Sequence, residues 1–294
     1  MKNHSPIILN CFSRGGSNIL WNIFLSHPEV CSPIEETLEL FRLNPKKNPR
    51  WAGYKLALIS GQPLFFNQWH LKPRKEISAK TKTYIDQVLF EHKLNTLNDA
   101  EMKFKAEGKL YTRSEVEQSR IVLKNNNGLT FLSDAFSDMY PDAIFVSLVR
   151  NPVALYESHK RRGLAKNVEQ FSGFYNTLCQ RILDDSKRLP SYRILKFETM
   201  IGDPKQTIQD LYSHADLDMK QVSQFRFKAK RFVHSDGKHR TEFERRKHYW
   251  FDIDNLHEIL EPKVNEYQNQ LLSDEEIEEV LNRTGNITTK LGYE

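Results

Sequence analysis

The sequence has few cysteines and no long apolar run. Cys11, Cys31 and Cys179 are far apart and form no CxxC pair, so one of the three stays unpaired in any disulfide scheme. This arrangement excludes a disulfide scaffold, argues against a zinc site and favours a reducing compartment. No stretch approaches the roughly 20 apolar residues that span a bilayer, and the run Pro6–Phe12 is too short for a signal peptide. We therefore expect a cytoplasmic protein without a membrane span.

Internal repeats, low-complexity tracts and long Gly/Ser linkers are also absent. Hydrophobic residues make up 39% and charged residues 28% of the 294 positions, which is the ordinary range for a globular protein. A chain of this length forms one large α/β domain or two small ones and can bury a sizeable core.

Positive charge is concentrated in one segment. The formal net charge is +5, but residues 226–248 hold nine Lys/Arg and three Asp/Glu, so the remaining chain is near −1. A basic segment of this kind indicates an anionic partner, such as a nucleotide, an acidic glycan or a nucleic acid. The alternative is a helix face whose charges are simply solvated.

Short β-like runs alternate with longer helical stretches. The pattern predicts strands at Ile7–Cys11, Tyr54–Ser60, Ile121–Leu123, Ala143–Val149 and Tyr192–Phe197. Ser17 is the predicted cap of the first helix, Pro152 opens another, and the chain after Leu217 is predicted to be helical. Such alternation favours a parallel sheet covered on both faces, whose ligands bind beyond the carboxyl ends of the strands.

The loop after the first predicted strand has the composition of an anion site. A glycine pair lets backbone N–H groups point into one concavity, and the N-terminus of the next helix adds partial positive charge. An arginine, a serine and an asparagine flank the pair and supply further donors. The candidate ligands are Arg14, Gly15, Gly16, Ser17 and Asn18. The alternative is a tight turn in which glycine serves packing alone.

This loop is not a Walker A motif, because that motif needs a lysine directly before the Ser/Thr, and no lysine precedes Ser17. The strand at Ala143–Val149 is followed by Arg150 instead of ending in an acidic residue. An enzyme that uses ATP and magnesium is therefore disfavoured.

A second strand–helix junction carries another candidate phosphate ligand. Arg150 follows the predicted strand, and Ser158 lies eight residues later, about two turns into the next helix. An arginine and a hydroxyl so placed can converge on one phosphate. The alternative is an ordinary junction with an arginine in a surface ion pair.

Together these segments resemble the sulfotransferase superfamily, in its carbohydrate and protein-tyrosine sulfotransferase-like branch. The resemblance covers about residues 5–215, although Gly15 stands where the family usually has serine and Asn18 where it has threonine. The matching segments are Arg14–Leu20 with His27–Pro28, Tyr140–Ala143, Arg150–Pro152 with Ser158, and Leu195–Met200 with Asp203–Pro204.

The resemblance implies a three-layer α/β fold like that of the P-loop NTPases. It implies a single domain over residues 1–294, with a nucleotide-binding core at about 5–215 and a helical C-terminal part at about 216–294. The co-substrate would be 3′-phosphoadenosine 5′-phosphosulfate (PAPS), and no metal is needed. The residues implied to bind it are Arg14, Gly15, Gly16, Ser17, Asn18, Arg150 and Ser158, with Lys238 and Arg240 of the basic segment closing over the nucleotide.

The segment Glu35–Glu36–Thr37 resembles the protein-tyrosine sulfotransferases, in which the second carboxylate is the base. We predict Glu36 as the catalytic base, with Glu35 as the next candidate and Arg14 as the catalytic cation. The alternative is a pair of acids that caps a helix near Pro33. Lys55 and Lys124 are candidate substrate-binding cations, or else ordinary strand lysines.

Three classes of function follow from these observations. The first is a sulfotransferase that acts on an acceptor hydroxyl. A glycan is the first candidate acceptor, and a lipid, a small metabolite or a peptide tyrosine stays open. The second is a P-loop kinase or NTPase-like enzyme, and the third is a non-enzymatic polyanion-binding protein. Nucleic acid is not expected as a partner, because the aromatic stacking pattern for it is missing. The sequence leaves the oligomeric state open.

Overall fold

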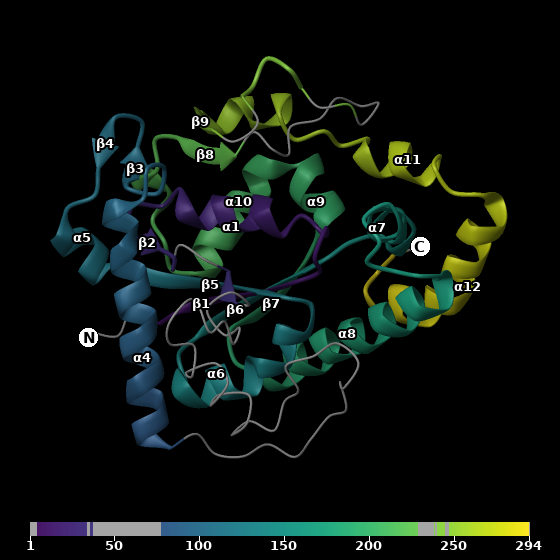
Figure 1. The fold of residues 1–294 in the computed structure, drawn as a ribbon, viewed down its shortest axis with the longest axis horizontal. Coiled ribbons are helices and arrows are strands. Elements are labelled where there is room, and N and C mark those ends of the chain that lie inside the picture. Colours follow the sequence, from purple (N-terminus) through teal and green to yellow (C-terminus); the bar gives the residue numbers. More distant parts are fainter. Residues whose placement is uncertain are drawn as a thin grey trace.

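A five-stranded parallel sheet forms the centre of the molecule, with the strand order β2-β5-β1-β6-β7 (Figure 1). The computed structural model describes residues 5–33, 36–37, 78–228, 238, 240–244 and 247–293. The five strands are β2 (Val30–Cys31), β5 (Arg120–Asn126), β1 (Ile7–Cys11), β6 (Ile144–Val149) and β7 (Tyr192–Lys196). The predicted parallel sheet is confirmed, while the strand predicted at Tyr54–Ser60 lies outside the described residues.

Strand β1 is the middle of the sheet, and all five of its residues are buried. It pairs with β5 on one side and β6 on the other, so that Leu9 lies opposite Lys124 and Val146. Side chains alternate across the sheet, and Leu9 joins one hydrophobic cluster while Ile8 joins another. A strand covered on both faces explains why Ile7–Cys11 is an apolar run without alternation.

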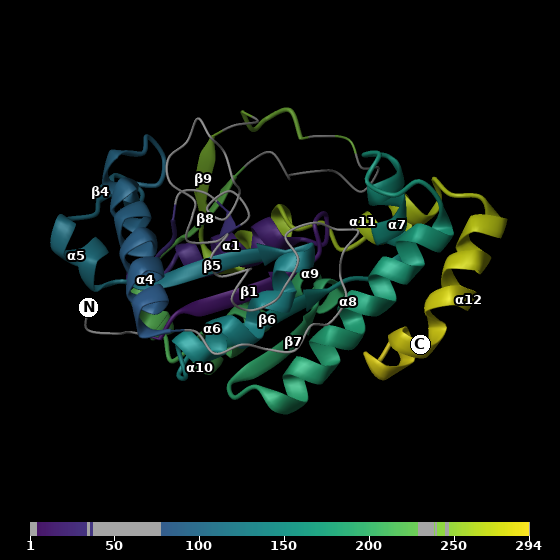
Figure 2. The same cartoon turned by 60° about the horizontal axis from the view of Figure 1, so that its bottom comes forward.

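Helices cover both faces of the sheet (Figures 1 and 2). On one face lie α1 (Ser17–Leu25), α9 (Phe197–Gly202) and α10 (Pro204–His214). The elements of the other face are α4 (Ala79–Leu94), α6 (Ser133–Met139) and α8 (Val168–Arg188). Helix α7 (Pro152–Lys160) begins at Pro152 as predicted, with Asn151 as its N-cap.

Smaller elements lie at the edges. After α4 come η2 (Asn95–Asn98), the hairpin β3 (Phe104–Ala106) and β4 (Lys109–Leu110), helix α5 (Arg113–Gln118) and, beyond β5, η3 (Asn127–Leu132). The C-terminal part holds η4 (Met219–Gln221), β8 (Phe225–Lys228), β9 (His248–Phe251), η6 (Ile253–Glu258), α11 (Val264–Asn269) and α12 (Asp274–Lys290). Figure 2 shows α12 running alongside α8. No helix in the described ranges is long and apolar enough to cross a membrane.

Three local expectations differ from the structure. The C-terminal part, expected to be helical, also contains the antiparallel pair β8–β9, in which Phe225, Arg226 and Phe227 are all buried. Strand β5 runs on to Asn126, since the buried Asn125 side chain donates to Asn10 inside the sheet. Ser17 is the first residue of α1 rather than its cap, and Gly16 occupies the cap position.

Candidate active site

The loop between β1 and α1 needs glycine for steric reasons. Gly16 has a φ of 93°, which side chains rarely adopt. A Cβ atom on Gly16 would lie 2.3 Å from Cδ2 of Phe197. At Gly15 the N–H donates to the Phe12 carbonyl over 3.1 Å, and a Cβ would come within 3.0 Å of the Phe12 Cβ. The backbone is therefore packed closely against its neighbours just before the N-terminus of α1.

Two polar side chains that the sequence analysis missed fix this loop at Ser13. Asn127 accepts from the Ser13 N–H over 2.8 Å and donates to the Ser13 hydroxyl over 3.0 Å. The His159 Nε2 lies 2.8 Å from the Ser13 carbonyl oxygen and donates to it. Burial lowers the pKa of His159, so the ring is neutral at pH 7. The loop is held from both sides before any ligand binds.

Arg14 and Ser158 come together although 144 residues separate them. The Arg14 Nε donates to the Ser158 hydroxyl over 3.1 Å. Arg14 itself has a φ of 68°, a left-handed conformation that turns the chain sharply at the end of β1. The two candidate phosphate loops therefore meet at one edge of the sheet, as parallel topology requires.

Arg150 is enclosed by protein groups. Its Nε donates to Asn265 Oδ1 over 3.0 Å, and its Nη1 donates to the Arg14 carbonyl oxygen over 2.9 Å. Its Nη2 donates to the Gln268 side-chain oxygen. The guanidinium also stacks 4.3 Å above the Phe197 ring. Burial lowers the pKa of Arg150 to about 10, which leaves it charged at pH 7. Helix α11, beside α7 in Figure 1, thus covers Arg150.

Two carboxylates hold these amide side chains in place. Gln268 donates to Glu157 over 2.9 Å, and Asn265 donates to Glu198. Glu198 also accepts from the Asn151 N–H over 2.9 Å and from the Tyr293 hydroxyl over 2.8 Å. The sequence does not show that these groups form a network, because its members lie on α7, α9 and α11 and, for Tyr293, three residues after the end of α12.

A second cluster contains the predicted base. The Lys124 Nζ lies 2.7 Å from Glu36 Oε1, and the side chains are 1% and 40% exposed. The same ammonium donates to Asn18 Oδ1 and lies 4.3 Å from the centre of the Trp21 ring. Asn18 belongs to the first turn of α1, so the structure brings Glu36, Lys124 and the glycine loop together.

Asn126 is a further member of this cluster that the sequence analysis missed. Its Nδ2 donates to Glu36 Oε2 over 2.7 Å. Lys124 and Asn126 are two residues apart on β5 and therefore project from the same face. Two polar residues that alternate at the end of a strand could have indicated Asn126 as a site residue. The predicted strand covered only Ile121–Leu123, so Asn126 was not placed on it.

Comparison with known proteins agrees with this architecture. Residues 6–221 match the family model described as "Sulfotransferase family". The chain belongs to the sulfotransferase family. Membership supports sulfuryl transfer as its reaction and implies a sulfonate donor and a hydroxyl-bearing acceptor. No curated protein matches the sequence significantly.

Two solved structures share the fold of this sulfotransferase. One is the sulfotransferase domain from the Synechococcus PCC 7002 olefin synthase, with 13% identity, a TM-score of 0.52, and coverage of 100% of this chain and 98% of that one. The other is the sulfotransferase domain from the curacin biosynthetic pathway, with 13% identity, a TM-score of 0.52, and coverage of 100% and 99%. At this identity the likeness shows the fold alone, an α/β sheet of the P-loop type.

The sulfotransferase has three buried polar atoms without a hydrogen-bond partner in or next to the Lys124–Glu36 cluster. They are the Trp21 Nε1, the Thr37 Oγ1 and the Asn126 Oδ1. Trp21 underlies the lysine, Thr37 follows the glutamate, and Asn126 donates to it. A buried polar group without a partner is unfavourable, so among the described residues these three atoms have hydrogen-bonding capacity that is not used.

Other predicted site residues have different surroundings. Arg240 forms an ion pair with Glu242 at 2.6 Å, donates to the Glu258 carbonyl and lies over the Phe243 ring, while Lys238 is exposed. Glu35 and Lys55 lie outside the described residues. In the described part of the chain, no group of three or more His, Cys, Asp or Glu residues could hold a metal ion.

The cysteines of this sulfotransferase are all free and buried. Burial raises the pKa of Cys11 to about 12, and it raises the pKa values of Cys31 and Cys179 as well. These thiols are therefore protonated at neutral pH.

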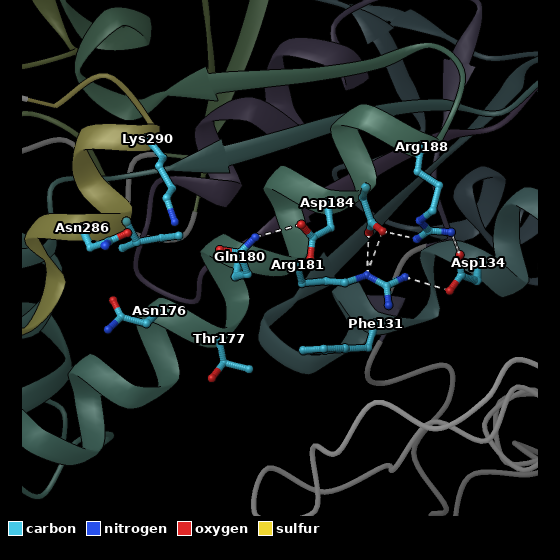
Figure 3. Close-up of a pocket in the computed structure, with 12 residues that line it drawn as sticks. Phe131, Asp134, Asn176, Thr177, Gln180, Arg181, Asp184, Arg188, Asn286 and Lys290 are labelled. Carbon is cyan, nitrogen blue, oxygen red and sulfur yellow. Dashed lines mark hydrogen bonds and ion pairs between the residues drawn. The ribbon is translucent and has the colours of Figure 1, made fainter.

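A cavity of about 680 Å³ lies between α8, α12 and η3 and shares no lining residue with either cluster (Figure 3). Four of its charged side chains pair with one another. Arg181 donates to Asp134 and to Asp185, at 3.0 and 2.8 Å, and Arg188 contacts both aspartates. These ion pairs join α6 to α8, so their role is to hold the two helices together.

Proposed function

We propose that the protein transfers a sulfuryl group from PAPS to an acceptor hydroxyl, with Glu36 as the base. The observation that carries the proposal is the Lys124–Glu36 ion pair at 2.7 Å, which lies next to Asn18 at the N-terminus of α1. A cation and a carboxylate thus stand beside a loop built for an anion. The proposal needs no metal-bound step.

The donor would span the two loops. The free N–H groups of the first turn of α1 and the Arg14 guanidinium would bind the 5′-phosphosulfate. Ser158 and Arg150 would bind the 3′-phosphate once Asn265 and Gln268 release the arginine. Lys238 and Arg240 remain candidates for closing over the nucleotide from the basic segment.

The reaction would be an in-line displacement at sulfur. The acceptor oxygen forms a bond to sulfur while the bond from sulfur to the bridging phosphate oxygen breaks. The acceptor proton goes to Glu36, and adenosine 3′,5′-bisphosphate leaves with the electron pair. Arg14 and Lys124 would stabilise the negative charge that builds on the leaving phosphate and on the sulfuryl oxygens.

We propose a carbohydrate or small-molecule hydroxyl as the acceptor, on the resemblance to carbohydrate sulfotransferases. The open atoms of Trp21, Thr37 and Asn126 are hydrogen-bonding positions that suit a polar acceptor or the sulfuryl group. We also propose a single sulfotransferase domain over residues 1–294 in the cytoplasm, which agrees with the three free thiols.

Calorimetric titration tests the choice of donor. We expect tight binding of adenosine 3′,5′-bisphosphate without magnesium and little binding of ATP with magnesium. Binding of ATP–Mg²⁺ in place of the bisphosphate would refute PAPS as the donor and favour the kinase-like alternative.

Substitution of the base tests the role of Glu36. Glu36→Gln keeps the size of the side chain and removes its proton acceptor, so turnover of PAPS should fall by about 10²–10⁴-fold. The affinity for the bisphosphate should stay within about twofold, because the carboxylate does not contact the nucleotide in this scheme. Wild-type turnover in this variant would transfer the role to another group.

A further inference from the structure

The side chain of Asn126 has one hydrogen-bonding partner among the described residues, and that partner is Glu36. Nδ2 donates to Glu36 Oε2 over 2.7 Å, whereas Oδ1 is buried and has no partner. The strand hydrogen bonds of β5 come from the backbone and do not need the amide. Among the described residues, the only side-chain hydrogen bond of Asn126 therefore goes to the proposed base.

The two oxygens of Glu36 are held by different groups. Lys124 contacts Oε1 and Asn126 contacts Oε2, each at 2.7 Å. Both side chains project from the same face of β5, which lies between β2 and β1 with Asn126 opposite Cys11. A central strand is a rigid support, so the two contacts define where the carboxylate lies.

In the proposed reaction the Lys124 ammonium would be shared between Glu36 and the sulfuryl group. Its ammonium is 1% exposed and has three donors, of which Asn18 and Glu36 each receive one. Negative charge that develops on the sulfuryl oxygens attracts the ammonium and weakens its hold on Glu36. A carboxylate that is 40% exposed would then lose its orientation unless a second group retains it.

A neutral donor suits that second task. The Asn126 amide binds one oxygen without adding a full positive charge, so the carboxylate keeps more of its affinity for the acceptor proton than beside a cation. With Oε2 held by Asn126, Oε1 is the oxygen that faces the site vacated by the ammonium. In this scheme Lys124 stabilises the charge on the sulfuryl group, while Asn126 keeps the Glu36 carboxylate in its orientation.

We propose that Asn126 is a positioning residue, which holds Oε2 of Glu36 so that Oε1 takes the acceptor proton when Lys124 turns to the sulfuryl group. This inference rests on the proposed function, since it assumes sulfuryl transfer with Glu36 as base. Asn126 acts through Glu36 and need not touch the donor.

The test is a double-mutant cycle on Glu36 and Asn126. The rate of PAPS consumption in a single turnover is measured through the release of adenosine 3′,5′-bisphosphate. The acceptor probes are water, N-acetylglucosamine and 4-nitrophenol. Asn126→Ala should lower the rate by about 10–100-fold, since a small misplacement of a reacting group has an effect of that size. In the Glu36→Gln background the same change should have almost no further effect.

Controls separate orientation from folding. Asn126→Asp is isosteric and places an acceptor against Glu36, so it should be at least as slow as the alanine variant while retaining the thermal midpoint within a few degrees. Asn286→Ala, an exposed asparagine on α12, should leave the rate unchanged. The affinity for the bisphosphate should be the same in all variants.

The outcomes are distinct. An equal loss from Asn126→Ala with and without Glu36→Gln, or no loss at all, would overturn the positioning role while leaving the proposed function intact. A wild-type chain that binds the bisphosphate but consumes PAPS with none of the probes would instead refute the proposed function, and this inference with it.

Discussion

Gly16 and Phe197 are in such close contact that the glycine loop and Arg150, the two candidate anion sites, pack on one aromatic ring. The ring lies under the Arg150 guanidinium at 4.3 Å, and its edge fills the space where a Gly16 side chain would be. A positive φ at Gly16 adds a second reason for glycine.

Gly16→Ala should therefore both destabilise the fold and weaken nucleotide binding. The left-handed backbone and the clash at 2.3 Å together should lower the free energy of unfolding, by about 1–3 kcal/mol. Urea unfolding and calorimetric titration with the bisphosphate are the measurements. Phe197→Ala removes the clash but also a buried core ring, so the double variant should lose less stability than the sum of the two single losses.

Gly173→Ala on α8 is the matched control for that substitution. No atom lies within 4 Å of a Cβ built there, and the residue is inside a helix. Alanine should raise stability by about 0.5–1 kcal/mol at such a position. An equal loss at both glycines would contradict the steric account of the loop.

Helix α11 is the element that decides whether Arg150 can reach a ligand. Its Asn265 and Gln268 place amide oxygens on the guanidinium where phosphate oxygens would bind. If the donor binds Arg150 as proposed, it must displace these oxygens, and nucleotide binding would then be coupled to a change at α11.

Substitution of Arg150 and substitution of the two α11 amides that contact it should change nucleotide affinity in opposite directions. Arg150→Ala should weaken bisphosphate binding by more than about 100-fold, because a charge-assisted bidentate contact is lost. The double substitution of Asn265 and Gln268 by alanine should strengthen binding by about 3–10-fold, because the competing acceptors are gone. Unchanged affinity on loss of Arg150 would remove that residue from the site, and weaker binding in the double variant would show that α11 supports the arginine instead.

The sequence was sufficient to predict the strands whose hydrophobic pattern matches their burial in the folded protein. Strands β1 and β6 are buried runs that are mostly apolar, so their ends and the polar residues beyond them could be located, and Arg14 and Ser158 do meet there. Asn126, Asn265 and Gln268 could not be found in this way. Their roles depend on contacts between segments far apart in the chain. Asn265 and Gln268 have no local signature, and Asn126 has only its alternation with Lys124 at the end of β5.

Across the whole molecule, three histidines are kept neutral by burial. His27, His159 and His248 all have lowered pKa values, with desolvation as the largest cause in each case. They lie just after the end of α1, in α7 and in β9, so the same effect acts on separate parts of the fold.

Stability should therefore fall as the pH drops from 7 to 5. The unfolded chain takes up protons near its histidine pKa of about 6.5, whereas the folded chain resists them until lower pH. Each histidine contributes a slope of up to about 1.4 kcal/mol per pH unit in that window. Unfolding by urea at several pH values measures it. His159→Gln keeps a donor for Ser13 and should make the decline shallower, and a slope equal to that of the wild type would contradict the assignment.

The burial of all three thiols has a practical consequence for observing α11. A maleimide reacts with thiolates, and Cys11, Cys31 and Cys179 are buried with raised pKa values, so the folded chain offers it no reactive native target. A single cysteine in place of the exposed Leu271, two residues after α11, would then carry a fluorophore without removal of any native cysteine. Its emission would change on addition of nucleotide if α11 leaves Arg150, which makes the motion visible without an acceptor.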